Sequence, residues 1–378
     1  MEIPRRPTYA EIDLDVLAQN FRSVRSFVAE DLEYMAVVKA NAYGHGSTQC
    51  AKVLEREGVS WFAVALVEEA LELRSAGIES PILCLGGFWP GQEAEALARR
   101  LTPVVFTVDA VHRLAAASPQ QDINLHLKID TGMGRIGVRP NDLSEFLDSL
   151  SRFPRVRIDG VMTHFAAADD PEENDFTESQ IREFRAGVAA IRSAGHSPRY
   201  LDMANSPGAV AHPASRSGLV RLGGILYGLI RDILPPDVPQ PDVRPVLSWR
   251  TAVGQLKRIE PGDTVGYGRS FRAERPTIIA TLPVGYHDGL RRALSNRGNV
   301  LVDGRPAPIV GRISMDWATI DVTDIDGVEI GTPVTLIGGS GDQAIRAEDL
   351  AAHLGTISYE ITCGIGSRVP RVYLNAGA

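Results

Sequence analysis

Two lysines and an arginine stand in apolar segments, where the fold could hold them close to a bound substrate. Lys39 ends the run YMAVVK and precedes a glycine-bearing turn, Lys128 ends LHLK, and Arg221 lies within LVRLGG. A lysine amine in such a place can act as a base or can bond covalently to a carbonyl carbon. Taken alone, each of these residues is more often a solvated or ion-paired side chain.

Other polar residues and glycines follow similar apolar runs, in YGHG, GVMTHFA, MANSPGA and LVRLGG. Hydroxyl groups and unobstructed backbone N–H groups are suited to binding an anion such as phosphate. Ordinary explanations for any one of them are a packed tyrosine, a core histidine, a helix-capping serine or a turn glycine. The residues are Tyr43, His164, Asn205, Ser206, Gly223 and Gly224.

The elements that must position these residues form a regular alternation of strand and helix patterns. Helix-like stretches such as VEEALELRSAG separate most of the apolar runs, as repeated βα units require. An amphipathic helix from about Leu14 to Val28 precedes the first run. We therefore predict a parallel (β/α)8 barrel of the TIM type, with the candidate residues at the carboxyl ends of its strands. The expected strands lie near residues 34–39, 61–66, 81–86, 103–107, 123–129, 158–163, 199–203 and 219–222.

The chain changes character after DILPPDVPQPDVRPVLSW, where five prolines between residues 235 and 245 interrupt both helix and sheet. From about residue 246, short runs of Val, Ile and Thr alternate with Gly-Asp, Asp-Gly and Gly-Gly turns, which is typical of β structure. We predict a barrel domain at residues 1–240 and a mainly β domain at 241–378. The first ten or so residues are expected to pack with the β domain.

Composition narrows the class of protein. The 378 residues carry a formal net charge of -8 with no block of basic residues, which argues against a nucleic-acid partner. Cys50, Cys84 and Cys363 are far apart and form no CxxC pair, so neither a disulfide framework nor a metal site is indicated. No signal peptide and no membrane-spanning run is found. These features predict a cytoplasmic protein with reduced thiols, and they leave small acidic or zwitterionic substrates open.

The segment GMGRIG at residues 132–137 fits the GxGxxG pattern of dinucleotide-binding turns. In that fingerprint the loop opens directly into a helix, and an acidic residue follows about 20 positions later. Asp159 stands at about that distance, so a dehydrogenase stays an alternative. Against it, Pro140 and Asn141 look like the start of the helix, and Arg135 within the loop has no role in such a site.

Taken together, YMAVVKANAYGHG, LHLKIDTGMGRIG, GVMTHFA, LVRLGGILYG and the terminal SRVPR resemble the alanine racemases, which are pyridoxal phosphate enzymes of fold type III. The resemblance covers nearly the whole chain. It implies an isomerase that interconverts L-alanine and D-alanine with two bases, and so supplies D-alanine for the peptidoglycan of the cell wall. It also implies a homodimer.

The resemblance assigns a role to each candidate. Lys39 would carry pyridoxal 5'-phosphate as an aldimine and serve as one base, and Tyr267 in DTVGYGRSF would be the second base. Arg221 would face the pyridine nitrogen, with His164 between it and the tyrosine and Asn205 near the cofactor. The phosphate would be bound by Tyr43, Ser206, Gly223, Gly224 and Tyr359.

For the substrate, the resemblance implies that Arg135 and the backbone N–H of Met315 bind the carboxylate. Lys128 matches a position that is often carbamylated, and the carbamate would orient Arg135. Tyr286 and Tyr359 would narrow the entrance, which favours alanine, although serine stays open as a second substrate. In the implied homodimer, Tyr267 and Met315 come from the opposite subunit.

Three rival functions remain. A decarboxylase on the same architecture would share Lys39, but it would more naturally pair the pyridine nitrogen with a carboxylate than with Arg221. A racemase of basic amino acids would need a roomier entrance. A non-catalytic pyridoxal phosphate carrier could keep the phosphate-binding residues, but it would need neither a second base nor a second domain.

Overall fold

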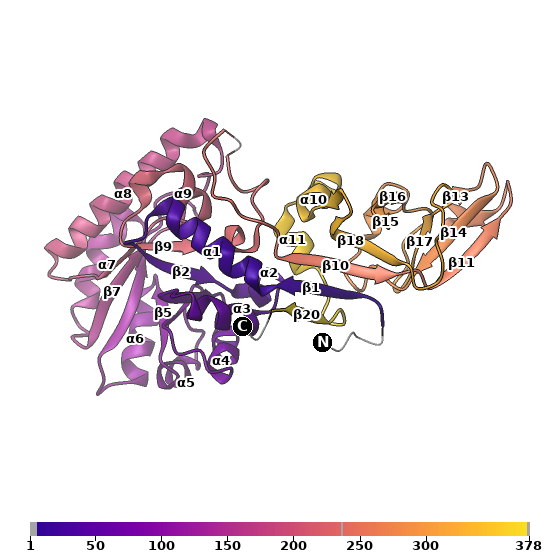
Figure 1. Ribbon diagram of the computed structural model, residues 1–378. Coiled ribbons are helices and arrows are strands. Elements are labelled where there is room, and N and C mark those ends of the chain that lie inside the picture. The colour runs from indigo at the N-terminus through magenta and orange to yellow at the C-terminus, as the bar shows by residue number, and fades with distance from the viewer. Residues whose placement is uncertain (1–5, 236, 376–378) are drawn as a thin grey trace.

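Eight parallel strands form a closed barrel in the computed structural model, which describes residues 6–235 and 237–375 (Figure 1). Each strand pairs with the next in chain order, and β9 pairs with β2 to close the ring. The predicted barrel is confirmed, and each expected run overlaps one strand. The strands are β2 (Glu33–Val37), β3 (Trp61–Val64), β4 (Ile82–Cys84), β5 (Leu101–Val105), β6 (Ile123–Lys128), β7 (Val156–Met162), β8 (Tyr200–Asp202) and β9 (Leu219–Leu222).

Helices connect the strands and cover the outside of the barrel (Figure 1). In α1, the predicted apolar face is buried, and Asp13 caps the helix by accepting hydrogen bonds from the N–H groups of Asp15 and Val16 at 3.1 Å. The helices of this region are α1 (Leu14–Val28), α2 (Lys39–Tyr43), α3 (Ser47–Arg56), α4 (Val67–Ser75), α5 (Glu93–Ala98), α6 (Val108–Ala117), α7 (Leu143–Leu150), α8 (Asn174–Ser193) and α9 (Ser206–Ala211).

In the part of the β domain that the structure describes, there are three sheets and two α-helices. Its main sheet has the order β16-β15-β18-β10-β1-β20, with β19 paired to β18, and the smaller sheets are β11-β14-β17 and β12-β13. The predicted mainly β character is confirmed. The elements are β10 (Leu247–Ala252), β11 (Gln255–Ile259), β12 (Thr264–Val265), β13 (Phe271–Arg272), β14 (Thr277–Leu282), β15 (Asn299–Val302), β16 (Arg305–Pro308), β17 (Ala318–Asp321), β18 (Pro333–Ser340), β19 (Gln343–Ile345), α10 (Ala347–Leu354), α11 (Ser358–Cys363) and β20 (Arg371–Leu374).

The strand β1 (Tyr9–Asp13) comes before the barrel in sequence but belongs to the sheet of the β domain. Tyr9 pairs with Arg250 of β10, and Ile12 pairs with Tyr373 of β20. Its inward residues Ala10 and Ile12 are fully buried. The sequence predicts the first helix but no strand before it. A five-residue strand whose partners lie far along the chain has little periodicity of its own from which it could be predicted.

The strand expected to end at Lys39 ends at Val37 instead. The residues from Ala40 to Tyr43 have φ angles of 51 to 55°, in the left-handed region, and Gly44 continues the turn with a φ of 85°. Each non-glycine residue in this region costs about 1–2 kcal/mol, so tertiary contacts must hold the turn. One of them is the hydrogen bond from the N–H of Ala40 to Oε1 of Glu69, at 2.6 Å.

Several loops contain a short 3-10 helix. The longest irregular connection in the described residues is the proline-rich segment. No helix or strand lies between the 3-10 helix η4 and β10 in the residues that the structure describes there. The 3-10 helices are η1 (Pro140–Asp142), η2 (Pro171–Glu173), η3 (Pro213–Ser215), η4 (Gly224–Tyr227), η5 (Tyr267–Arg269) and η6 (Arg292–Leu294).

Candidate active site

Most of the predicted site residues lie at one end of the barrel, where the parallel strands reach their carboxyl ends. Lys39 follows β2 within two residues, Lys128 ends β6, His164 follows β7, Ser206 follows β8 and Arg221 lies in β9. The closed barrel therefore gathers side chains that are separated by up to 182 residues in sequence. This convergence is what a catalytic site on a parallel barrel requires.

Arg221 is the buried centre of this end of the barrel. One guanidinium nitrogen forms an ion pair with Asp202 at the end of β8. The other lies 3.0 Å from Nδ1 of His164 and donates to the carbonyl oxygen of Thr163 at 3.1 Å. Three partners on two neighbouring elements fix the plane of the guanidinium, so this arginine cannot swing to another partner without leaving a buried charge unpaired.

Asp202 was not among the residues singled out from the sequence. Its side chain is fully buried, Oδ1 accepts from Arg221, and Oδ2 has no hydrogen-bond partner. The sequence feature that could have identified Asp202 is its place at the end of an expected strand, next to the strand that carries Arg221. That signal depends on knowing that β8 and β9 are adjacent in the barrel.

The charges around Lys39 lower its proton affinity. Burial, followed by the guanidinium groups of Arg135 and Arg221, lowers the pKa of Lys39. Burial also lowers the pKa of Lys128 to about 8, with Arg221 and Arg135 acting in the same direction. Both amines therefore lose a proton more readily than a solvated lysine, which makes them better nucleophiles near neutrality.

Burial and neighbouring positive charges disfavour the protonated form of His164. Burial lowers its pKa well below the ordinary value, and Arg221, Lys128, Arg135 and Lys39 all act in the same direction. The cationic side chains around His164 therefore disfavour a charged imidazolium. The positive field of the site comes from the lysines and arginines.

Two glycines, a serine and two tyrosines form a polar cradle beside these cations. The hydroxyl of Ser206 accepts a hydrogen bond from the N–H of Gly223 at 3.0 Å. The rings of Tyr43 and Tyr359 lie edge to face at 4.9 Å. A Cβ atom on Gly223 would approach the hydroxyl of Tyr43 to 2.7 Å, and one on Gly224 would overlap the ring of Tyr359. Only glycine leaves the two phenols in place.

Asn205 has a structural task in this arrangement. Its Oδ1 accepts from the N–H of Gly208 at 3.0 Å and so caps α9.

Burial raises the pKa of Tyr43, so its phenol keeps its proton and can donate a hydrogen bond. The cradle thus offers neutral hydrogen-bond donors next to a cluster of cations, which suits an anionic group.

The segment GMGRIG forms a loop that no helix continues directly. The carboxylate of Asp130 accepts from the N–H groups of Gly132 and Gly134, at 3.2 and 3.0 Å. The next elements are η1 at Pro140 and α7 at Leu143. The dinucleotide-binding alternative needs a helix that opens at the last glycine, and the structure has none there.

Three of the expected site residues lie apart from the barrel end, on the β domain. The side chains of Tyr267, Met315 and Tyr286 are 71%, 51% and 42% exposed. Tyr267 begins η5, which is followed after Ser270 by β13, and β13 lies at the end of the molecule farthest from the barrel (Figure 1). In the described part of the chain, no hydrogen bond joins these three side chains to Lys39, Arg135 or Arg221.

No group of three or more His, Cys, Asp or Glu side chains that could hold a metal ion occurs among residues 6–235 and 237–375. Within the same residues, no helix is long and apolar enough to cross a membrane. Cys50, Cys84 and Cys363 are free thiols.

Comparison with known proteins gives matches over the whole length. The model of the alanine racemase N-terminal domain matches residues 12–231, and that of the C-terminal domain matches residues 246–373. The alanine racemase of Geobacter sulfurreducens is 41% identical over 98% of each chain, and that of Halothermothrix orenii is 41% identical over 98% of this chain and 97% of its own.

Solved structures agree with these matches. The alanine racemase of Bacillus anthracis with bound L-Ala-P superposes with a TM-score of 0.93 at 37% identity, over 99% of this chain and 97% of that one. The enzyme from the D-cycloserine producer Streptomyces lavendulae gives 0.92 at 36% identity, over 99% and 98%. With a closed barrel, a β domain and family models that together match most of its residues, this chain belongs to the alanine racemase family.

Proposed function

We propose that this protein interconverts L-alanine and D-alanine with pyridoxal 5'-phosphate as its cofactor. The observation that carries the proposal is that Lys39, whose pKa is lowered by burial and by the guanidinium groups of Arg135 and Arg221, stands at the same end of the barrel as Arg221 and the cradle of Ser206 and Gly223. An aldehyde-bearing phosphate ester needs an amine, an anion site and a partner for its ring nitrogen at one place, and this end of the barrel supplies all three.

The residues present fit this cofactor. Ser206, Tyr43, Tyr359 and the N–H groups around Gly223 and Gly224 would hold the phosphate, and Lys39 would bind the aldehyde carbon covalently. Because neither glycine has a Cβ atom, the phenol groups of Tyr43 and Tyr359 occupy space that any other side chain would fill. When bound, pyridoxal phosphate withdraws electrons from the substrate Cα and so makes its proton easier to remove.

Arg221 biases the site towards racemisation. A guanidinium stays charged under physiological conditions and only donates hydrogen bonds, so a ring nitrogen facing it stays unprotonated. Arg221 would thereby favour return of a proton to Cα over other reactions of the substrate. A carboxylate at this place would favour decarboxylation or transamination instead. Asp202 is a carboxylate nearby, but its Oδ1 is engaged by Arg221 itself.

Two bases serve the two faces of Cα in this proposal. The amine of Lys39 takes or returns the proton on one face, and the phenol of Tyr267 does so on the other. Because Tyr267 is exposed on the β domain of its own chain, it would act in the site of a second copy. The proposed assembly is therefore a homodimer in which Met315 and Tyr286 also reach the partner's barrel.

The substrate carboxylate would be held by the planar fork of Arg135 and by the N–H of Met315 from the partner chain. Lys128, with a pKa of about 8, has a neutral amine available for carbamylation near neutrality. The resulting anion would face Arg135 and relieve the repulsion between the two cations. Tyr286 and Tyr359 would narrow the entrance to admit alanine in preference to larger amino acids.

We further place the domain boundary at residues 240 and 241, within the proline-rich segment. The free thiols are consistent with the proposed cytoplasmic location, where D-alanine would enter peptidoglycan synthesis.

Proton NMR in deuterated water tests the function directly. Purified protein with pyridoxal phosphate is incubated with L-alanine, L-serine, L-lysine or L-arginine in separate samples. The proposal expects loss of the Cα proton signal fastest for alanine, with the carbon skeleton retained and D-alanine formed. Amine products would instead indicate a decarboxylase, and absence of exchange with all four would indicate a carrier.

A further inference from the structure

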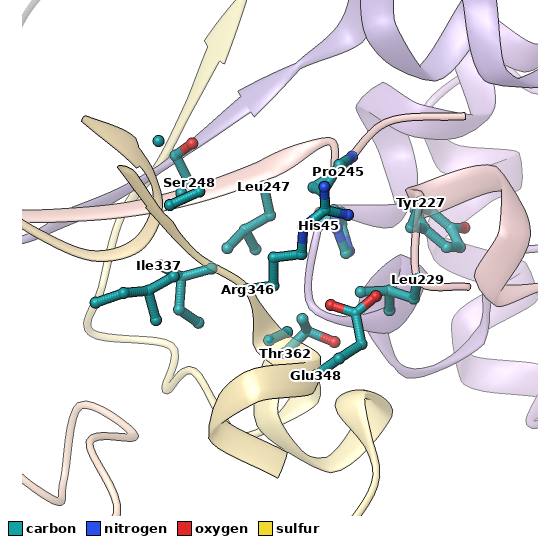
Figure 2. A pocket seen from close by; sticks show the side chains of 15 residues that line it. His45, Tyr227, Leu229, Pro245, Leu247, Ser248, Ile337, Arg346, Glu348 and Thr362 are labelled. Atoms are coloured by element: carbon teal, nitrogen blue, oxygen red, sulfur yellow. The ribbon is translucent and has the colours of Figure 1, made fainter. Parts of the chain in front are cut away.

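A cavity of about 180 Å³ lies between the barrel and the β domain, and none of the residues proposed for catalysis lines it. His45 and Tyr227 line it from the barrel side, and Arg346 and Glu348 line it from the segment that begins α10 (Figure 2). Leu247 and Ile337 add apolar walls from β10 and β18. We call this space the interdomain cavity.

His45 presents an unused hydrogen-bond acceptor in this cavity. Its ring is fully buried, and Nδ1 lies 2.9 Å from the carbonyl oxygen of Ala42 and 3.0 Å from that of Tyr43. Carbonyl oxygens only accept, so Nδ1 carries the hydrogen and Nε2 is left as an acceptor. Nε2 is buried and has no hydrogen-bond partner among the residues that the structure describes. Burial lowers the pKa of His45 to about 4, which keeps the ring neutral at physiological pH.

Glu348 presents a second unused acceptor from the other domain. Its side chain is buried, and Oε1 accepts from the N–H of Ile230 at 3.3 Å. Oε2 is buried, and within residues 6–235 and 237–375 it has no hydrogen-bond partner. Buried polar atoms in native proteins nearly always have a hydrogen-bond partner, so two such acceptors in one cavity indicate a ligand that donates hydrogen bonds.

A cation completes the polar lining. Arg346 extends its guanidinium towards His45 and Pro245 (Figure 2). Within the described residues, no hydrogen bond or ion pair joins that guanidinium to another side chain. The cavity therefore combines two acceptors, one group of cationic donors and apolar walls. Glu348 and Arg346 bring opposite charges to the cavity, and these match the ammonium and carboxylate groups of a zwitterion.

We propose that the interdomain cavity is a second binding site, for a small aliphatic α-amino acid in its zwitterionic form. The ammonium group donates to Oε2 of Glu348 and Nε2 of His45, the carboxylate accepts from Arg346, and the side chain packs against Leu247 and Ile337. The site is linked to the phosphate cradle, because His45 bonds to the backbone of Tyr43 and stacks on Tyr227 at 4.6 Å.

The test is a crystallographic titration of the holoenzyme with α-aminoisobutyric acid. This probe is a small aliphatic zwitterion without a Cα proton, so it cannot be racemised if it also enters the active site. Crystals are soaked over a concentration series, and the occupancy of the interdomain cavity is refined. We expect the probe in the cavity, with its ammonium group at Glu348 and its carboxylate at Arg346.

Two variants of the cavity and two probes that carry only one of the two charges serve as comparisons. Glu348→Gln keeps the shape of the side chain and removes its charge, and Arg346→Gln removes the cation at a more exposed position. Each should raise the half-occupancy concentration at least tenfold, whereas the exposed control Glu183→Gln on α8 should leave it unchanged. Isobutyrate and tert-butylamine, which carry one charge each, should bind at least tenfold more weakly. Water alone in the cavity at every concentration, or equal occupancy in all variants, would overturn the proposal.

Discussion

Nη2 of Arg221 lies 3.0 Å from Nδ1 of His164, and this contact decides the tautomer of the histidine. A guanidinium nitrogen can only donate, so Nδ1 accepts and the single hydrogen of the neutral ring resides on Nε2. Because Arg221 donates to Nδ1, His164 in turn offers the N–H at Nε2 as a hydrogen-bond donor to its next neighbour. In the proposed dimer that group is the phenol of Tyr267 from the partner, whose anionic form the Nε2–H would stabilise.

Asp202 anchors this pair, and its removal should weaken both stability and cofactor binding. In Asp202→Asn, the buried guanidinium loses its counter-charge, and breaking a buried ion pair costs about 3–5 kcal/mol. We expect the free energy of unfolding to fall by an amount near the lower end of this range, since the asparagine side chain keeps one hydrogen-bond acceptor. Denaturant unfolding measures it, and the absorption of bound pyridoxal phosphate reports the change at Arg221.

The matched control is Asp159→Asn, which removes the partner of the exposed Arg199. Surface ion pairs contribute about 0–1 kcal/mol, so this variant should be nearly as stable as the parent. Equal losses in the two variants would show that Asp202 has no special role.

Shared sites can be tested by complementation between subunits. Lys39→Ala and Tyr267→Phe should each lower kcat by about 10²–10⁴, the usual range for a missing acid or base. A heterodimer of the two variants contains one site with both residues intact if Tyr267 acts in the partner's barrel. We expect about half of the parent activity per dimer.

The heterodimer is purified through two different affinity tags, and each homodimeric variant serves as its control. If activity stays at the level of the homodimers, Lys39 and Tyr267 of one chain act together, and the proposed exchange of residues is wrong.

Lys128 should make stability rise with pH in the apoenzyme without carbon dioxide. Its folded pKa is about 8, below the ordinary value of about 10.4. Below pH 8 the folded state carries the full cost of a charged, buried amine. Between about pH 8 and 10.4 the unfolded state binds more protons, so the free energy of unfolding increases with pH, by an amount on the order of 3 kcal/mol. Lys128→Met should reduce this rise and leave the part that Lys39 contributes through its own lowered pKa, whereas Lys52→Met, at an exposed lysine, should retain the rise in full.

Carbamylation of Lys128 gives a separate spectroscopic signature. Protein equilibrated with ¹³C-labelled bicarbonate should show a carbamate carbon signal by NMR, because the amine is partly neutral near pH 8. Lys128→Arg should lose the signal, and Lys52→Arg should keep it. A spectrum of the parent protein without a carbamate resonance would leave Lys128 as an unmodified amine.

The two glycines of the cradle should be intolerant of a methyl group. In Gly223→Ala, the added Cβ would approach the hydroxyl of Tyr43 to 2.7 Å and displace it from the proposed phosphate site. We expect the Kd for pyridoxal phosphate to rise at least tenfold, measured by fluorescence titration of the apoenzyme. Gly254→Ala is the control, because its Cβ would meet no atom closer than 3.5 Å. A Kd unchanged in Gly223→Ala would exclude this part of the cradle.

The sequence by itself determined the periodic elements and the chemical types at their ends. Eight apolar runs separated by amphipathic segments specify repeated βα units, since burial on both faces demands such strands. Lys39, Lys128 and Arg221 could be placed at one end of the barrel for the same reason. Tight local turns, such as the left-handed one after Lys39, escaped prediction because tertiary contacts offset their intrinsic cost.

Tertiary structure alone decided which groups face one another. Asp202 becomes the partner of Arg221 only because β8 and β9 are neighbours, and β1 joins β10 and β20 across most of the chain. The exposure of Tyr267, away from Lys39 of its own chain, likewise depends on how the β domain extends from the barrel. Local periodicity encodes the burial of each segment, whereas these long-range contacts depend on the closure of the whole chain.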